Sequence, residues 1–313
     1  MSYSLKGKKI WVAGHNGMVG RALIRALASE ECDILTVDRQ QLDLRDQQGV
    51  GQWMSEYKPD AIFLAAAKVG GIGANQSAPA EFLYDNLAIA SNVIHAAYLA
   101  QVQKLLFLGS VCIYPKFADV PVKEEALLTG ALEPTNQAYA MAKIAGLKMC
   151  EAYREQYGCD FISAMPTNLY GPYDHFNAES SHVIPALIHK LHHAKRENAA
   201  SVTIWGTGTP RREFLHVDDL ASALILLMRE YSEAEAINIG CGVDILIKDL
   251  AAMLVDVIGY KGELLFDTSK PDGTPRRHLD TTKMDAMGCA HTTDLHEGLT
   301  ATYDWYQAHV AKV

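Results

Sequence analysis

Short apolar segments alternate with longer amphipathic segments through the first half of the chain. The apolar segments KIWVAG, DILTVD and AIFLAA are separated by GRALIRALAS and QQGVGQWMSEY, which have helical periodicity. KLLFLGS and DFISAMPTNLYG continue the strand series, and helical stretches at 81–100 and about 137–157 separate them. Strands that alternate with helices are typical of parallel βαβ units. We therefore predict an α/β fold with a doubly wound, parallel Rossmann sheet as a dinucleotide-binding domain over residues 1–170.

The pattern changes after residue 170. A His-rich helix at 182–196, the strand SVTIWG and the turn GTGTPRR lead into shorter mixed elements. We expect residues 171–313 to form mainly a smaller, mixed α/β substrate domain. The helix at 217–231 and the apolar strand at 236–242 still have the pattern of sheet elements, so residues near 214–242 are expected to return to the first domain.

Composition and charge exclude several classes of protein. The chain has 313 residues and a formal net charge of −9, without a long basic run, so nucleic acid and anionic membranes are not predicted partners. No apolar run approaches the roughly 18 residues of a membrane span, and the first residues lack the pattern of a signal peptide, so a cytoplasmic location is expected. Six scattered cysteines without a CxxC pair predict reduced thiols and no metal site.

A glycine-rich loop follows the first predicted strand. VAGHNGMVG places Gly14, Gly17 and Gly20 at GxxGxxG spacing, directly after a strand and at the start of a helix. Glycines there let the backbone approach a pyrophosphate, and the helix N-terminus supplies oriented N–H groups. Asp38, at the predicted end of the second strand, favours NAD(H), because a carboxylate there binds the ribose and disfavours a 2′-phosphate. The neighbouring Arg39 favours the 2′-phosphate of NADP(H), so both cofactors stay open.

Three residues have the pattern of a carbonyl-reducing site. Tyr139 and Lys143 stand four residues apart in NQAYAMAK, and so share one face of a helix. A lysine there is expected to lower the tyrosine pKa and to hold the nicotinamide ribose, which leaves the phenol able to exchange a proton with a carbonyl. Ser110 ends the fourth strand, at the edge where open α/β sheets bind ligands. Two residues later, Cys112 has by itself the pattern of a small buried hydrophobe.

These motifs resemble the extended short-chain dehydrogenase/reductase superfamily, of the kind that modifies nucleotide sugars. Within it, eight segments resemble the GDP-L-fucose synthase family of GDP-4-keto-6-deoxy-mannose epimerase-reductases. The segments run from Gly14 to Arg277 and are AGHNGMVG, LAAAKVGGI, LFLGSVCIYPK, EPTNQAYAMAKIAG, MPTNLYGP, SHVIPAL, WGTGTPRREFLHVDD and SKPDGTPRR. The resemblance implies an NADP(H)-dependent enzyme that acts on a GDP-sugar, and a homodimer formed through the helices at 81–100 and 137–157.

The family's reaction gives Cys112 a chemical role. It inverts carbons 3 and 5 beside a carbonyl at carbon 4, and then delivers hydride to that carbonyl. Epimerisation next to a ketone needs a base to remove a proton and an acid to return one on the opposite face. By resemblance, Cys112 is the base and His182 the acid, and they complete a catalytic set with Ser110, Tyr139 and Lys143.

The resemblance also assigns binding residues. For the dinucleotide it implies Gly14, Gly17, Met18, Gly20, Asp38, Arg39, Ala66, Lys143, Pro166, Asn168 and His182. For the GDP-sugar it implies Asn168, Val183, Lys190, Trp205, Arg212, Lys270, Asp272 and Arg276. Some family members carry arginines that hold a 2′-phosphate at the positions of Asn16 and Val37, and this departure keeps NADH open beside NADP(H).

Other functions remain as alternatives. A GDP-L-colitose synthase, which inverts only carbon 5 of a 3,6-dideoxy-4-keto sugar before reduction, shares every motif named above. A non-catalytic protein that senses dinucleotides is disfavoured, because the Ser110, Cys112, Tyr139, Lys143 and His182 set is intact. A 4,6-dehydratase is disfavoured because SVCIYP lacks an acid pair, and a 4-epimerase needs no Cys and His pair.

Overall fold

The fold is described from a computed structural model that covers residues 2–178, 180–289 and 291–311. Within these residues, the central sheet has six parallel strands in the order β2-β1-β3-β4-β5-β9. The strands are β1 (Lys9–Ala13), β2 (Asp33–Leu35), β3 (Ala61–Leu64), β4 (Lys104–Leu108), β5 (Asp160–Pro166) and β9 (Ile237–Ile239). The strand order reverses between β1 and β3, which is where open α/β sheets form a ligand crevice. The predicted α/β fold with a parallel sheet is confirmed.

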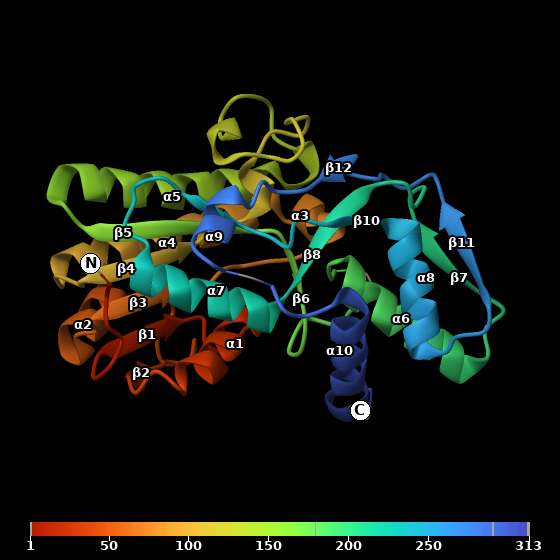
Figure 1. Cartoon of the computed structure of the whole chain (residues 1–313), viewed down its shortest axis with the longest axis horizontal. Helices are drawn as coiled ribbons and strands as arrows, with labels where there is room; N and C mark the ends of the chain where they lie inside the picture. Colours follow the sequence, from red (N-terminus) through yellow and green to blue (C-terminus); the bar gives the residue numbers. More distant parts are fainter. Residues whose placement is uncertain (1, 179, 290, 312–313) are drawn as a thin grey trace.

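Helices cover both faces of this sheet (Figure 1). Along β1, Ile10 and Val12 pack on one face, whereas Trp11 packs on the other, because successive strand residues point to opposite faces. The first face is covered by α1 (Met18–Leu27) and α7 (Val217–Glu230), and the second by α2 (Gln47–Tyr57), α4 (Pro79–Leu99) and α5 (Gln137–Tyr157). Burial on both faces explains why the strands read as nearly continuous apolar segments.

Helix α5 lies unusually close to β4. A Cβ atom added at Gly146 would lie 2.5 Å from Cζ of Phe107, so only glycine permits this approach. The Lys143 ammonium lies 4.9 Å from the centre of the same Phe107 ring. The close contact therefore fixes the part of α5 that carries Tyr139 and Lys143 against the end of β4.

The segment DFISAMPTNLYG forms two strands in different sheets. β5 ends at Pro166, and β6 (Asn168–Tyr170) pairs with β8 (Arg211–His216). β8 also pairs antiparallel with β10 (Asp244–Leu246) and parallel with β12 (Arg276–Arg277). β7 (Ser201–Trp205) and β11 (Glu263–Asp267) pair with each other. The chain thus passes from the central sheet into the second region beside the end of β5.

A separate hydrophobic core supports the second region. It lies among α6 (Val183–Glu197), α8 (Ile247–Ile258) and α10 (Leu295–His309), at the right-hand end of Figure 1. Two shorter helices, α3 (Ile72–Ser77) and α9 (Thr282–Ala286), connect other elements. After the second region begins, α7 and β9 return to the central sheet. The division into domains at residue 170 stays a prediction.

In the described part of the chain, none of the helices has the length and apolar character that crossing a bilayer requires. Nor do the described residues include three or more His, Cys, Asp or Glu side chains grouped so that they could hold a metal ion.

Candidate active site

A large cavity lies between the central sheet and the second region. Its volume is about 1100 Å³, and it runs from the glycine loop past the ends of β3 and β4 to α6, β7 and β8. Most of the predicted site residues line it. These are Gly14, Gly17, Met18, Gly20, Arg39, Ala66, Ser110, Cys112, Tyr139, Lys143, Pro166, Asn168, His182, Val183, Lys190, Trp205, Arg212 and Asp272.

The glycine loop has the backbone that a dinucleotide pyrophosphate requires. Gly14 has φ +94°, and a Cβ added there would lie 2.7 Å from backbone atoms of Ala66. A Cβ at Gly20 would lie 2.2 Å from the Gly14 carbonyl oxygen. The loop therefore packs against β3 and directs the N-terminus of α1 at the cavity, without acidic residues in its first turn. Free N–H groups and the helix dipole there suit an anion, so the site fits a dinucleotide.

The region predicted to hold the adenosine ribose has mixed charge. β2 ends at Leu35, so Asp38 lies in the loop after the strand rather than at its end. An oxygen of Asp38 accepts a 2.6 Å hydrogen bond from Nδ2 of Asn16 and lies 3.4 Å from Nε2 of His15. Arg39 lines the cavity, and its guanidinium lies 3.9 Å from Asp43. A carboxylate and an arginine, each with a partner of its own, thus lie at neighbouring positions of this loop.

The predicted catalytic residues gather where β4 meets α5. Ser110 follows β4, and its Oγ accepts a hydrogen bond of 3.3 Å from the backbone N–H of Cys112. The Ser110 hydroxyl is also a hydrogen-bond partner of Tyr139. The Lys143 ammonium donates a 2.7 Å hydrogen bond to the carbonyl of Leu108, the last residue of β4. Packing of α5 against the end of β4 therefore brings together residues about thirty positions apart in the sequence, as we predicted.

Burial controls the protonation of the tyrosine and the lysine. It raises the pKa of Tyr139, and a negative charge on Cys112 raises it further, whereas the bond with Ser110 lowers it. Burial lowers the pKa of Lys143 to about 8. The expected lowering of the tyrosine pKa is absent in the free protein, since desolvation is the largest influence on that pKa. Tyr139 therefore keeps its proton at neutral pH and is a proton donor.

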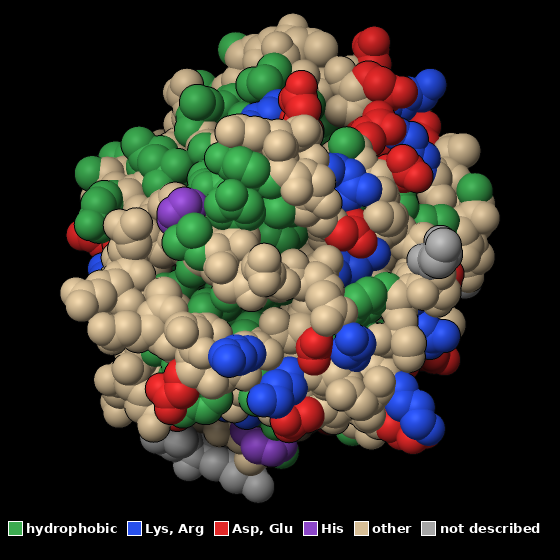
Figure 2. Space-filling view, turned by 90° about the vertical axis from the view of Figure 1, so that its left-hand side faces the viewer, with side chains coloured by type: hydrophobic (Ala, Val, Ile, Leu, Met, Phe, Trp, Pro, Cys, Tyr) green, Lys and Arg blue, Asp and Glu red, His purple; other side chains and the backbone are tan. Residues whose placement is uncertain are grey.

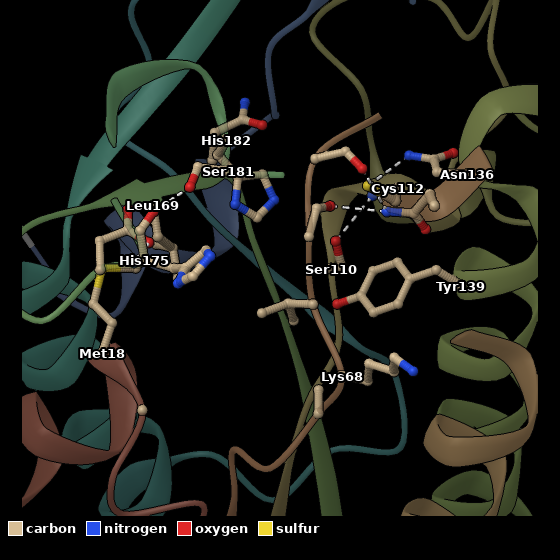
Figure 3. Close-up of a pocket in the computed structure, with 18 of the residues that line it drawn as sticks. Met18, Lys68, Ser110, Cys112, Asn136, Tyr139, Leu169, His175, Ser181 and His182 are labelled. Carbon is tan, nitrogen blue, oxygen red and sulfur yellow. Dashed lines mark hydrogen bonds between the residues drawn. The ribbon is translucent and has the colours of Figure 1, made fainter. Parts of the chain in front are cut away.

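Figure 3 shows Cys112 and His182 on opposite sides of the cavity. Cys112 lies with Ser110 and Tyr139 on one side. His182 lies on the other, at the residue before α6, and its imidazole faces the cavity. Desolvation within the cavity lowers the pKa of His182, although its side chain stays accessible to solvent from the cavity. A flat ring bound between the two sides would therefore have a thiol on one face and an imidazole on the other.

The expected nucleotide end contains an aromatic ring with two lysines close to it. Trp205, at the end of β7, is 45% exposed, and the ammonium groups of Lys190 and Lys270 lie 5.6 and 5.4 Å from its ring centroids. Asp272 accepts hydrogen bonds from the backbone N–H and hydroxyl of Thr207, which fixes the turn after β7. Lys270 lies at the Trp205 ring but outside the cavity lining.

Strand alternation separates two neighbouring arginines. Arg276, a predicted substrate residue, does not line the cavity, because its guanidinium pairs with Asp244. Arg277 lines the cavity instead and lies in register with Arg212 on β8. Burial and the neighbouring Arg277 lower the pKa of Arg212 to about 10. The pair forms a concentrated positive charge in the cavity lining, whereas Arg276, the residue named from the sequence, lies outside that lining.

Three further cavity residues were missed by the sequence analysis. Asn136 donates a hydrogen bond to the sulfur of Cys112, and Glu133 accepts one from the backbone N–H of Thr135. Asp174 lies in the loop before α6, and burial raises its pKa to about 7. The sequence feature that could have identified Asn136 is its position in EPTNQAYAMAK, three residues before the predicted catalytic tyrosine. For Glu133 and Asp174 the sequence pattern gives no distinct signal.

Comparison with known sequences gives one family over most of the chain. Residues 10–240 match the NAD dependent epimerase/dehydratase family. The chain is 55% identical to the GDP-L-fucose synthase of Sinorhizobium fredii, over 99% of this chain and 98% of that protein. It is 37% identical to the GDP-L-colitose synthase of Yersinia pseudotuberculosis, over 95% of this chain and 97% of that protein.

Solved structures agree with these relatives. A GDP-6-OMe-4-keto-L-xylo-heptose reductase from C. jejuni superposes with a TM-score of 0.92 and 38% identity, over 98% of this chain and 99% of that one. A GDP-L-fucose synthetase from Naegleria fowleri, bound to NADP, superposes with a TM-score of 0.90 and 27% identity, over 100% of this chain and 98% of that one.

Proposed function

The chain belongs to the NAD dependent epimerase/dehydratase family, and on this premise we propose that it converts GDP-4-keto-6-deoxy-D-mannose to GDP-L-fucose as a 3,5-epimerase and 4-reductase. The observation that supports this most is the arrangement of Cys112 and His182 on opposite sides of one cavity, with Tyr139 beside the cysteine (Figure 3). The higher identity to a fucose synthase than to a colitose synthase favours the same conclusion.

The epimerisation step uses two side chains of this chain. The Cys112 thiolate removes the proton from a carbon next to the C4 carbonyl, and the electron pair of the broken C–H bond moves into an enolate. His182 then gives a proton to the opposite face of that carbon, which restores the ketone with inverted configuration. The thiol formed and the neutral imidazole return to their starting protonation by exchange with solvent, and the same two groups act at C3 and C5.

The reduction step uses the Ser110, Tyr139 and Lys143 group. The cofactor is NADP(H), and when bound its reduced nicotinamide supplies the hydride that adds to carbon 4. Tyr139 gives its proton to the C4 oxygen, and Ser110 donates a hydrogen bond to the same oxygen. A tyrosine that stays protonated at neutral pH suits this direction of proton transfer. Residues that hold the dinucleotide are Gly14, Gly17, Met18, Gly20, Arg39, Ala66, Lys143, Pro166 and Asn168.

The other end of the cavity binds the GDP part of the substrate. Arg212 and Arg277 supply positive charge for the diphosphate, and the Trp205 ring supplies a stacking surface for guanine. Val183, Lys190 and Asp272 complete this end, and Asn168 contacts the sugar. We assign this role to Arg277 and not to Arg276, because the side chain of Arg277 lines the cavity and that of Arg276 does not.

The experiment is incubation of the purified protein with GDP-4-keto-6-deoxy-D-mannose and NADPH in deuterated water, with the product read by NMR. We expect deuterium at carbons 3 and 5 and protium from the cofactor at carbon 4. Deuterium at carbon 5 alone, or turnover only of a 3-deoxy substrate, identifies a colitose synthase. Reduction without deuterium at either carbon contradicts the epimerase proposal.

Single substitutions separate the two steps within this experiment. Cys112→Ser and His182→Ala should each lower deuterium incorporation by about 10²–10⁴-fold while NADPH binding is retained. Cys159→Ser and His189→Ala are matched controls that should keep the parent rate. Tyr139→Phe should lower hydride transfer by a similar factor but leave deuterium exchange intact. If Cys112→Ser or His182→Ala kept the parent rate of deuterium exchange, the substituted residue would have no part in epimerisation.

We also propose that the protein is a homodimer that pairs α4 and α5 of one copy with those of another. Exposed hydrophobic side chains on these helices support this, namely Tyr84, Leu99, Met141 and Tyr157, which are 64%, 65%, 45% and 47% exposed. Figure 2 shows hydrophobic side chains gathered on one part of the surface. Paired by a two-fold axis, the helices would form a four-helix interface.

We also propose that the protein is located in the cytoplasm. All six cysteines are free thiols, and Cys112 can remove a proton only while it is reduced. Reducing conditions that keep such thiols intact are those of the cytosol. Detection of the protein in a separated cytosolic fraction tests this location.

A further inference from the structure

We infer that Asn136 is a positioning residue that holds the sulfur of Cys112 in its thiolate form for proton abstraction. This role rests on the proposed epimerase function, because it explains how a thiol becomes a base. It is not implied by the motif that carries Tyr139 and Lys143. It follows instead from the contacts of the amide group at the start of α5.

The Asn136 amide is directed at the cysteine. Its Nδ2 donates a hydrogen bond of 3.2 Å to Sγ of Cys112, and Figure 3 shows this contact beside Ser110. The backbone N–H of Cys112 is held by Oγ of Ser110. One donor therefore points at the sulfur, while a second contact fixes the backbone that carries it.

The Asn136 side chain does not cap its own helix in the usual way. Asn136 is the N-cap residue of α5, a position where asparagine usually accepts a hydrogen bond from an N–H of the first helical turn. Its side chain makes no such capping bond. In the described chain its Oδ1 is buried and has no hydrogen-bond partner. Both observations indicate that the amide orientation serves the sulfur rather than the helix.

A hydrogen bond from an N–H donor stabilises a thiolate more than a neutral thiol. A hydrogen bond to an ionised acceptor is stronger than one to a neutral acceptor, so the Asn136 amide favours the thiolate over the thiol. The S–H of a thiol would need an acceptor, and the Asn136 oxygen accepts no hydrogen bond from any described residue. The amide therefore stabilises the form of Cys112 that removes a proton.

Charged groups from three elements interact electrostatically with Cys112. Burial lowers the pKa of Lys143 on α5, and of Arg212 and Arg277 on β8 and β12, and a negative charge on Cys112 opposes each of these shifts. The same negative charge on Cys112 also raises the pKa of Tyr139 on α5.

Glu133 is the acidic group on this side of the cavity. It opposes the burial effect on both arginines, and so partly offsets their charge. The cations supply a general positive field, whereas Asn136 supplies the one side-chain hydrogen bond to the sulfur that the described structure contains. Loss of the Asn136 amide should therefore act specifically on the thiolate of Cys112.

The test is alkylation of Cys112 by iodoacetamide between pH 6 and 10, followed by mass spectrometry of its peptide. Asn136→Asp keeps the shape and remains a good N-cap residue, but replaces the donor by a carboxylate. We expect its alkylation at pH 7 to be about tenfold slower than in the parent, and its pH profile to move to higher pH. Asn136→Ala, which removes the donor without adding charge, should fall between the two.

The matched control is Gln137→Glu, which adds one negative charge at the exposed neighbouring position of the same helix. It should alkylate within about twofold of the parent, since its charge is screened by solvent. Equal slowing in Gln137→Glu and Asn136→Asp, or no slowing in Asn136→Asp, overturns the role of the amide.

A second readout connects the amide to turnover and separates this inference from the proposed function. Deuterium exchange into the sugar should slow by the same factor as alkylation in each Asn136 variant, with NADPH binding unchanged. Slow alkylation with parental exchange overturns the catalytic role. Absence of exchange in the parent protein overturns the epimerase function, whereas the alkylation series still decides whether Asn136 holds the thiolate.

Discussion

At the residue scale, the environment of a side chain decides its chemistry more than its type does. Lys143 is buried and Tyr139 is partly buried, so the tyrosine keeps its proton and the lysine loses part of its affinity for one. The spacing of these residues predicted their meeting, because helix geometry is local. Their protonation depended on burial by distant parts of the chain, and spacing contains no information on that.

Asp38 is the residue at which cofactor preference can be tested most directly. Its carboxylate is 59% exposed and lies beside the glycine loop, where it repels a 2′-phosphate. We expect Asp38→Asn to bind NADPH about three- to tenfold more tightly, with NADH affinity unchanged or weaker, because one negative charge is removed in a solvent-exposed place. Fluorescence titration of both reduced cofactors measures this.

The control for this prediction is Asp33→Asn, at the opposite end of β2, which removes the same charge further from the loop. Its affinities should match those of the parent. If Asp38→Asn fails to improve NADPH binding relative to this control, Arg39 alone governs the 2′ position and the carboxylate has no part in the preference.

At the element scale, strand alternation determines which of two identical side chains reaches the cavity. β12 is two residues long, and Arg276 and Arg277 therefore point in opposite directions. Arg277 donates hydrogen bonds to the carbonyls of Tyr114 and Pro115 while it lines the cavity, whereas Arg276 pairs with Asp244. The sequence TPRR has no alternating pattern from which this direction could be predicted.

Arg277→Lys and Arg276→Lys form a matched pair that tests the register. A lysine retains the charge but not the planar group that bonds several oxygens at once, so Arg277→Lys should weaken GDP binding about tenfold. Arg276→Lys should change it by less than about twofold, since its ion pair with Asp244 lies outside the cavity lining. Calorimetric titration with GDP measures both, and equal effects of the two substitutions would contradict the assignment.

Other elements show why some boundaries were predictable and others were not. The helix segments QQGVGQWMSEY and 137–157 match α2 and α5, because amphipathic periodicity over several turns is a strong local signal. DILTVD was predicted as a longer strand than β2, and DFISAMPTNLYG divides into β5 and β6. Which sheet a strand joins depends on its distant partners, here β9 and β8, rather than on its own residues.

At the scale of the whole molecule, the site is assembled from both regions of one chain. The glycine loop, β4 and α5 supply the dinucleotide and proton-transfer residues, while α6, β8 and β12 supply His182 and the arginine pair. Motifs predicted most members of this set, because each motif is local in sequence. Their arrangement on two sides of one cavity is a property of the folded chain, and residues such as Arg277 and Asn136 emerge only from it.

The proposed homodimer gives a prediction at this scale. The double variant Leu99→Glu/Met141→Glu places two charges on the exposed apolar face of α4 and α5, and should be a monomer near the chain mass of 34.3 kDa in light scattering. The parent should have about twice that mass. The control, Val243→Glu/Leu265→Glu, alters exposed apolar positions outside these helices and should remain a dimer.

Activity of the monomeric variant then tests whether dimerisation and catalysis are independent. One chain by itself supplies the whole proposed catalytic set to its cavity, so we expect turnover within about threefold of the parent despite dissociation. A dimeric double variant would place the interface on another surface. A monomer that binds NADPH but no longer turns over would mean that α5, which carries Tyr139 and Lys143, needs the partner's helices to hold these residues in position.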